Sequence, residues 1–159
     1  MRAAPDVIQI GEIRDTESMR AALDMAGTGH LVLATVHSNN APETLDRIIN
    51  LFPQDLHRQL LMDLSLNLRA VISQRLVKGV DGRRVAAIEI LVNTPHIADL
   101  ILKGELHEIK AAMEGSGTRG MQTFDMALHT LFTEERISLE EALSNADSRT
   151  NLEARINFG

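Results

Sequence analysis

The first 40 residues contain two short apolar runs separated by an amphipathic segment. Residues 7–10 form an apolar run between Pro-Asp and Gly, which is typical of a buried strand. Residues 16–26 carry apolar side chains at helical spacing, and glycines end this segment. Residues 31–36 are apolar at nearly every position, which indicates a strand buried on both faces of a parallel sheet. The strand-helix-strand order predicts an α/β layer.

Further along, the pattern predicts two helices, a hairpin and then only helices. Residues 42–52 and 54–72 have helical spacing of their apolar side chains. Residues 74–77 and 85–92 are typical of a hairpin, because the Asp-Gly between them supplies the positive φ of a tight turn. The remaining apolar segments predict helices at 97–102, 106–113, 124–132 and 139–143, then a frayed tail containing Leu152 and Ile156.

The predicted sheet is small for a parallel α/β layer. Two strands and a hairpin are too few to shield both faces, so we expect further strands upstream of Met1. An unpaired edge on the first strand would invite self-association, so we expect a dimer or larger species. The glycine-rich residues 115–120 are the candidate for a flexible joint.

Composition narrows the classes of function. The formal net charge of −6 disfavours a nucleic-acid partner, which requires a basic face. The absence of Cys excludes disulfides and thiolate zinc sites and fits a reducing cytosol. No apolar run approaches the roughly 20 residues that cross a bilayer, and no leader precedes the first strand. We therefore expect a cytoplasmic protein.

The end of the first predicted strand carries a candidate catalytic carboxylate. Ligands of open α/β sheets bind outside the carboxyl ends of the strands, where Gly11 and Glu12 lie. Glu12 can orient an attacking water, and Arg14 can offer a fork of donors to phosphate or to a neighbouring subunit. The alternative is structural: Glu12, Arg14 and Asp15 solvate the strand end and cap the next helix.

The second predicted strand ends in another polar cluster that includes Thr35 and His37. His37 can donate a hydrogen bond to a γ-phosphate oxygen, or it can be a satisfied structural residue. His30 lies seven residues earlier, roughly 23 Å away along an extended strand, which is too far for a shared metal. We therefore predict no metal site.

Several stretches resemble the secretion ATPases of the PilT type. MRAAPDVIQIGEIRDTESM resembles their Walker B region and TGHLVLATVHSNNAPETLDRIINLFP their histidine box, and LRAVISQRLV and GMQTFDMALHTLF extend the match. The resemblance implies ATP hydrolysis, with Mg²⁺, in a hexameric ring that drives pilus movement. It makes Glu12 the Walker B glutamate and Thr35, His37 and His30 the nucleotide-sensing residues. Arg14 and Arg47 are candidates for contact with phosphate or a neighbouring subunit.

The same resemblance implies a fold and a subfamily. Residues 1–92 are expected to form part of a RecA-like P-loop ATPase core, and residues 93–159 an all-α C-terminal subdomain. Assembly ATPases carry a tetracysteine module after the Gln74-Arg75-Leu76 segment, and its absence here favours a retraction motor. Residues 96–103 lack the arginines of the AIRNLIRE-like signature, which favours the accessory retraction branch, PilU.

One family feature does not occur in the sequence. No glycine-rich loop ending in Lys-Ser or Lys-Thr is present to wrap phosphates with backbone amides. We therefore expect the whole motor, and not this chain alone, to bind ATP and Mg²⁺. The expected partners are PilT-like motor subunits and the inner-membrane platform of the pilus, with which the chain would associate peripherally. The alternative is a catalytically inactive interaction module that docks on motor subunits.

Overall fold

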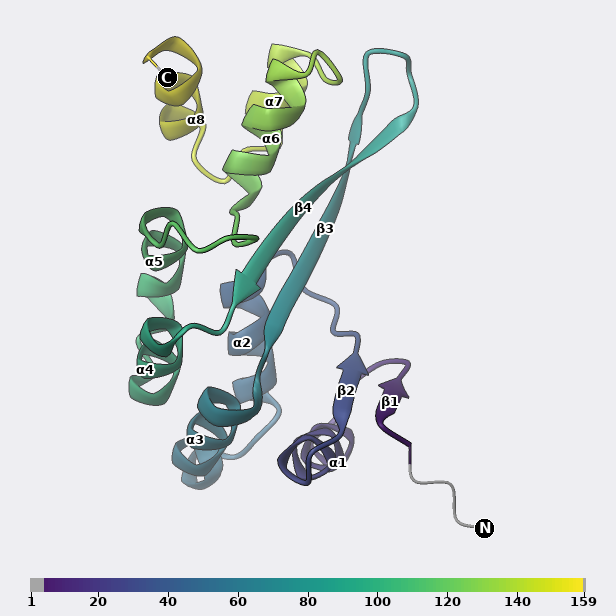
Figure 1. Cartoon of the computed structure of the whole chain (residues 1–159), viewed down its shortest axis with the longest axis vertical. Helices are drawn as coiled ribbons and strands as arrows, with labels where there is room; N and C mark the ends of the chain where they lie inside the picture. The colour runs from purple at the N-terminus through teal and green to yellow at the C-terminus, as the bar shows by residue number, and fades with distance from the viewer. Residues whose placement is uncertain (1–4, 159) are drawn as a thin grey trace. The chain divides into compact units, whose positions relative to one another are not determined.

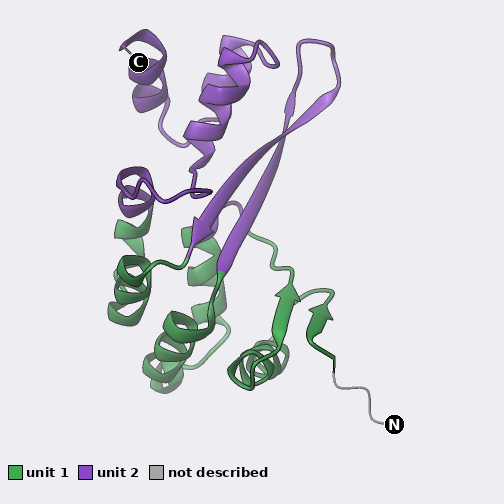
Figure 2. Cartoon of the chain, viewed as in Figure 1, with its two compact units in different colours: residues 1–38, 42–69, 93–109 green, residues 39–41, 70–92, 110–159 purple. Residues whose placement is uncertain are grey.

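The structure is a computed structural model that describes residues 5–158. The chain divides into two compact units whose segments interleave in sequence (Figure 2). Unit 1 contains residues up to 38, 42–69 and 93–109, and unit 2 contains residues 39–41, 70–92 and 110 onward. The expected division into a core of residues 1–92 and a helical subdomain of residues 93–159 stays a prediction.

Unit 1 begins with a strand, a helix and a parallel strand, as predicted (Figure 1). Strand β1 (Val7–Ile10) pairs in register with β2 (Leu31–Ala34), so that Ile10 lies beside Ala34. Helix α1 (Thr16–Gly27) connects them and packs against β2. Asp15 caps α1 by accepting a hydrogen bond from the backbone of Ser18 at 2.8 Å. The two strands therefore end at the same edge of the sheet.

The burial predicted for the second strand is wrong. Regular pairing ends at Ala34, and the side chains of Leu31 and Leu33 are 48% and 52% exposed. Val7 on β1 is 52% exposed. The reason is that the parallel sheet has only two strands among residues 5–158, with α1 packed against β2, so part of its apolar surface is uncovered.

The remaining helices of unit 1 lie on either side of the hairpin in the chain. Helix α2 (Ala41–Asn50) leads through a 3₁₀ turn (Gln54–Leu56) into α3 (His57–Asn67), which packs against α4 (Pro95–Lys103). A 3₁₀ turn (Leu106–Glu108) follows α4. Thr94 caps α4 by accepting from the backbone of Ile97.

The helix predicted at 54–72 is shorter than expected. It ends at Asn67, because Leu68 has extended backbone and Ala70 already pairs with Val92 in the hairpin. The Asn93 side chain donates to the carbonyls of Ser65 and Leu68 at 3.0 and 2.9 Å, which satisfies groups that the helix end leaves free. Pairing between distant segments outweighed the local helical pattern.

Unit 2 is built on a long hairpin. Strands β3 (Ala70–Lys78) and β4 (Arg84–Val92) pair antiparallel and twist around each other (Figure 1). The turn is where the sequence predicts it, and Gly82 there has φ +81°. The helices that follow are α5 (Ile109–Gly115), α6 (Phe124–Thr133), α7 (Leu139–Ser144) and α8 (Arg149–Phe158).

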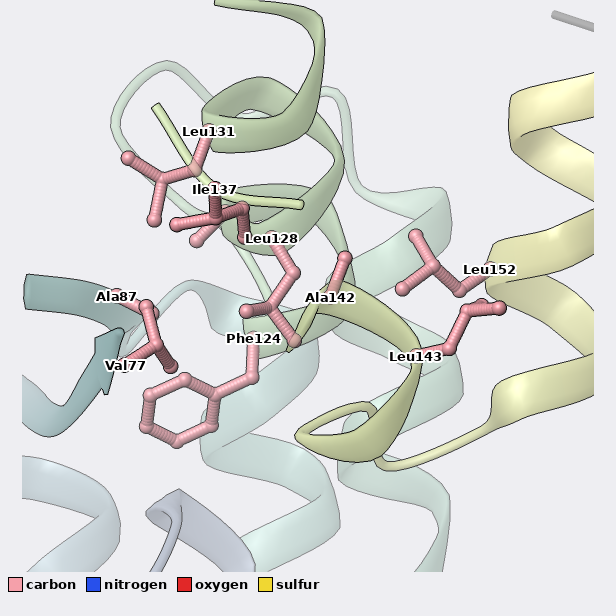
Figure 3. Packing of buried hydrophobic residues seen from close by; sticks show 10 residues of the cluster. Val77, Ala87, Phe124, Leu128, Leu131, Ile137, Ala142, Leu143 and Leu152 are labelled. Atoms are coloured by element: carbon pink, nitrogen blue, oxygen red, sulfur yellow. The ribbon is translucent and has the colours of Figure 1, made fainter. Parts of the chain in front are cut away.

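The core of unit 2 joins the hairpin to the last three helices (Figure 3). Phe124 and Leu128 of α6 are fully buried, beside Val77 of β3 and Ile137 before α7. Leu152 of α8 is 1% exposed, so the expected frayed tail is wrong: the segment is a helix that buries a side chain. Burying one such leucine contributes about 1.5–3 kcal/mol.

The predicted fold class is confirmed in its arrangement, with a parallel pair, an antiparallel hairpin and a helical C-terminal part. Among the helices formed by residues 5–158, none has the length and apolar character needed to cross a membrane.

Candidate functional site

The candidate site begins in the loop after β1, where Ile13 is an anchor. Ile13 is 4% exposed, and its backbone N–H donates to the carbonyl of Thr35 at 2.9 Å. Its neighbours Glu12 and Arg14 form an ion pair with each other. The buried apolar residue thus fixes the backbone, and the two charged residues on either side of it meet.

The end of β2 reaches the same place. Because Ile10 and Ala34 are register partners, the residues that follow each strand are neighbours. The Thr35 hydroxyl donates to the carbonyl of Gly11. The Nε2 atom of His37 lies 3.1 Å from Oε1 of Glu12. The structure therefore brings together Glu12, Arg14, Thr35 and His37, which are four of the six candidate site residues that the sequence singled out.

The electrostatics of this edge keep Glu12 ionised. The hydrogen bond from Arg14 lowers the pKa of the Glu12 carboxyl, and the charges of Arg14, His37 and Arg47 act in the same direction against partial burial. The same pair raises the pKa of the Arg14 guanidinium. Glu12 is 21% exposed, whereas the side chains of Arg14 and His37 are 76% and 77% exposed. The ionised carboxylate of Glu12 is thus partly buried and contacts two exposed side chains, Arg14 and His37.

His30 lies outside this group. It precedes β2, at the opposite end from Thr35 and His37. Its Nδ1 atom lies 3.1 Å from the Thr28 hydroxyl and 3.1 Å from the carbonyl of Met25, so it closes the end of α1. Among the described residues no group of three or more His, Cys, Asp or Glu side chains is placed to hold a metal ion.

Unit 2 contains a cluster of buried and partly buried charged residues that the sequence pattern did not predict, here called the unit 2 polar cluster. Arg75 forms an ion pair with Asp147 at 2.6 Å, and Lys110 lies 3.1 Å from Asp147 and 3.6 Å from Asp125. Glu89, at 1% exposure, completes the cluster, because the charges of Asp147 and Arg75 act on it. In the sequence, the feature that indicates this cluster is Glu89, a single carboxylate in the apolar run from Ala86 to Val92.

Hydrogen bonds and the Phe124 ring fix the cluster. Burial opposes ionisation of Asp147, but the hydrogen bonds from Arg75 and Lys110 outweigh it and lower the Asp147 pKa. The Arg75 guanidinium also lies over the ring of Phe124, 3.9 Å from its centroid. Asp125 accepts from the backbone of Asp147 and Ser148, which holds the start of α8.

Residues 1–87 match the family model described as Type II/IV secretion system protein, which covers more than half of the chain. The chain belongs to this family. The type IV pilus ATPase PilU of Pseudomonas aeruginosa is 54% identical over 100% of this chain and 42% of the relative. The type IV pilus retraction ATPase PilT of the same organism is 42% identical over 92% of this chain and 42% of the relative.

A solved structure of this secretion family has the same fold. The crystal structure of the pilus retraction motor PilT with bound ADP matches 94% of this chain and 42% of that chain, with a TM-score of 0.84 and 38% identity. The predicted resemblance to PilT and PilU is confirmed, and identity is higher with PilU than with PilT of the same organism. The chain spans less than half the length of these relatives.

Proposed function

We propose that this chain forms the part of a type IV pilus ATPase that supplies the Walker B glutamate and the histidine-box residues of a retraction motor. The observation that carries the proposal is the contact of 3.1 Å between Glu12 and His37 at the neighbouring ends of two parallel strands. Homology to PilU and PilT supports it. Ligands of open α/β sheets bind at this edge.

In this proposal Glu12 orients and polarises the water that attacks phosphate. Its two oxygens face Arg14 and His37, and each oxygen has a further lone pair that can accept from a water. Arg14 keeps the carboxylate ionised, so the base is present at neutral pH. Thr35 fixes the turn at Gly11, and His37 acts as the sensor whose exposed ring can turn from Glu12 to a phosphate oxygen.

The residues at this edge fit the terminal phosphate of ATP. Arg14, His37 and Arg47 place donors of positive or potentially positive charge around Glu12. When bound, ATP with Mg²⁺ supplies the phosphoryl group that passes to water. The loop that cradles the other phosphates is not encoded in these 159 residues, so we expect ATP and Mg²⁺ to leave the melting temperature of the chain alone unchanged.

A chimera tests the proposal directly. This chain replaces the matched segment of Pseudomonas aeruginosa PilU, and Mg²⁺-dependent ATP hydrolysis is measured. We expect the chimera to hydrolyse ATP. The Glu12→Gln variant should lose turnover by about 100-fold or more but retain ATP binding, as expected for loss of a base. Glu17→Gln, an exposed carboxylate on α1, is the matched control and should remain active. Full turnover by Glu12→Gln would refute the assignment.

The proposal extends to assembly and location. We propose that the motor acts as a hexamer, that it contacts PilT-like subunits and the inner-membrane platform of the pilus, and that it is cytoplasmic and peripheral to that membrane. In the 159-residue chain alone, the exposed apolar residues Val7, Leu31 and Leu33 support self-association. Light scattering of the chimera should give the mass of six subunits, and a monomer at working concentration would contradict this.

A second candidate is an interaction module that docks on a PilT-like motor subunit without hydrolysing ATP. The observation that favours it is the exposed apolar face of β3, where Ile72 is 71% and Leu76 55% exposed. Co-purification of the 159-residue chain with full-length PilT, lost on Ile72→Lys, would support this candidate. Retention of the complex in that variant would exclude β3 as the contact surface.

A further inference from the structure

Thr44 is a polar residue on the buried side of α2. It is 7% exposed, and its apolar neighbours on the helix, Leu45 and Ile48, are 0% and 5% exposed. A hydroxyl in such a place requires a hydrogen-bond partner, because burial removes it from water. A partner that lies outside the helix indicates which part of the chain the hydroxyl connects to α2.

The Thr44 hydroxyl reaches beyond its own helix. Its oxygen lies 2.6 Å from the hydroxyl oxygen of Ser38, so one of the two groups donates to the other. On α6 the hydroxyls of Thr130 and Thr133 instead donate to carbonyls four residues earlier in the same helix. Ser38 follows β2, and both residues of the contact belong to unit 1. The contact thus joins the segment after β2 to α2.

Each partner in this contact is close in sequence to a residue of the candidate site. Ser38 directly follows His37, whose Nε2 atom lies 3.1 Å from Oε1 of Glu12. Thr44 precedes Arg47 by three positions on α2, and side chains at this spacing are neighbours on a helix surface. The charge of Arg47 also acts on Glu12. The hydroxyl pair therefore connects the segment that carries His37 to the helix that carries Arg47.

The other end of α2 is also held within unit 1. At the start of α1 the Thr16 hydroxyl donates to the carbonyl of Leu51, directly after α2. The Arg20 guanidinium lies over the ring of Phe52, 5.7 Å from its centroid. Helix α1 itself begins four residues after Glu12. The helix that carries Arg47 is thus bonded to the segments that follow both strands of the site.

We propose that Ser38 and Thr44 are positioning residues of the candidate site, joined by their hydroxyl contact. The contact sets the places of His37 and Arg47 relative to Glu12. This inference rests on the proposed function in so far as Glu12 is the base and His37 the sensor. The alternative is a contact that only stabilises α2, and its loss would leave the carboxylate and the imidazole unchanged.

Nuclear magnetic resonance on the 159-residue chain tests this without ATP. The readouts are the pH titration of the Glu12 carboxyl and the ¹⁵N shifts of the His37 ring. The hydrogen bond from Arg14 and the nearby charges lower the Glu12 pKa, so displacement of the Arg47 charge should raise it. In Thr44→Val we expect the Glu12 pKa to rise and the His37 shifts to move. Thr44→Ser retains the hydroxyl and should have the wild-type values of both.

A double substitution distinguishes positioning from other effects on the carboxylate. Arg47→Gln removes the charge and should raise the Glu12 pKa by itself. If Thr44 acts through Arg47, the addition of Thr44→Val to Arg47→Gln should raise that pKa no further. Ser65→Ala is the matched control, because Ser65 is a helix residue of unit 1 at 9% exposure whose hydroxyl donates to the carbonyl of Met62 at 2.7 Å. It should leave both readouts unchanged.

Ser38→Ala removes the same contact from the other side. It should change the Glu12 titration in the same direction as Thr44→Val, and it provides the test if Thr44→Val fails to fold. Circular dichroism establishes which variants are folded. A folded variant that lacks either hydroxyl and leaves the Glu12 titration or the His37 shifts unchanged would overturn the proposal.

The PilU chimera adds a kinetic readout. Thr44→Val should lower kcat for ATP by about fivefold, which corresponds to about 1 kcal/mol for one hydrogen bond, and Thr44→Ser should restore it. The acid limb of the pH profile should move to higher pH in Thr44→Val, because a base with a raised pKa is protonated there.

The two experiments separate the positioning role from the proposed function. If the unsubstituted chimera does not hydrolyse ATP but the Glu12 and His37 signals change as expected, the proposed function fails and the positioning role stands. If the chimera is active and Thr44→Val changes neither kcat nor these signals, the positioning role fails alone.

Discussion

Arg75 binds Asp147 and two backbone carbonyls in unit 2, and its removal makes a quantitative prediction. The substitution Arg75→Met retains the apolar stem of the side chain and removes the guanidinium. It breaks the ion pair with Asp147, the hydrogen bonds to two backbone carbonyls and the stacking on Phe124. Among the described residues, Asp147 keeps only Lys110 as an ion-pair partner, and Glu89 loses the favourable effect of the Arg75 charge.

The magnitude follows from exposure and geometry. The Arg75 and Asp147 side chains are 24% and 17% exposed, between the surface pairs that contribute up to about 1 kcal/mol and the buried pairs whose breakage costs about 3–5 kcal/mol. Stacking at 3.9 Å on Phe124 adds about 1 kcal/mol. Lys110 still neutralises Asp147 at 3.1 Å and offsets part of the loss. We expect the free energy of unfolding to fall by about 2–3 kcal/mol.

Urea unfolding and calorimetry measure this change. In a chain of this length a loss of 1 kcal/mol lowers Tm by about 2–4 °C, so Arg75→Met should lower Tm by roughly 4–12 °C. Lys110→Met is the matched control, because Lys110 contacts the same Asp147 but is 31% exposed and should cost about 1 kcal/mol or less. The reasoning is refuted if Arg75→Met destabilises the chain no more than Lys110→Met does.

Three further predictions concern other parts of the chain. Burial raises the pKa of Glu89 in the folded state above its value of 4.5 in the unfolded state. Protonation of Glu89 therefore stabilises the fold. This stabilisation is complete below pH 4.5 and is lost as pH rises through the raised pKa. In Glu89→Gln, urea titrations should no longer show this decrease in the free energy of unfolding as pH rises. Thr94→Ala should cost about 1 kcal/mol of unfolding free energy through loss of the α4 cap, with Thr94→Ser as control. Leu33→Glu should reduce the mass measured by light scattering, because Leu33 is 52% exposed on β2.

Each of these has a contradicting outcome. The same pH dependence in Glu89→Gln and the unsubstituted chain would mean that Glu89 is not the group whose proton affinity rises on folding. Equal stability of Thr94→Ala and Thr94→Ser would show that the hydroxyl does not cap α4. A monomer at all concentrations of the unsubstituted chain would contradict the role given to Leu33 before the variant is made.

The candidate site was predictable to the extent that it is local in sequence. Glu12 and His37 each follow an apolar run, and parallel strands carry both to one edge, so strand order alone placed them together. His30 shows the limit of that reasoning. Resemblance to the family groups it with the other nucleotide-sensing residues, but in the structure it lies at the opposite end of β2 and contacts Thr28 and Met25.

The errors in the fold arise where distant segments compete with local pattern. The helical spacing of residues 54–72 continued past Asn67, but pairing of Ala70 with Val92 converted the last residues into strand. Leu152 and Ile156 were too widely spaced to predict more than a tail, yet Leu152 packs into the core of unit 2 and α8 forms around it. Helical propensity is weak, and packing decides such segments.

The sequence by itself determined the order of strands and helices, the hairpin turn at Gly82 and the residues at the two strand ends, because these depend on periodicity and on backbone restrictions within a few residues. Only the tertiary structure decided which charges are partners. Arg75 and Asp147 are 72 residues apart, and Glu89 reaches Ala41 across 48 residues. Hydrogen bonds of this kind depend on positions that are fixed only once the hairpin and helices have packed, so no local pattern encodes them.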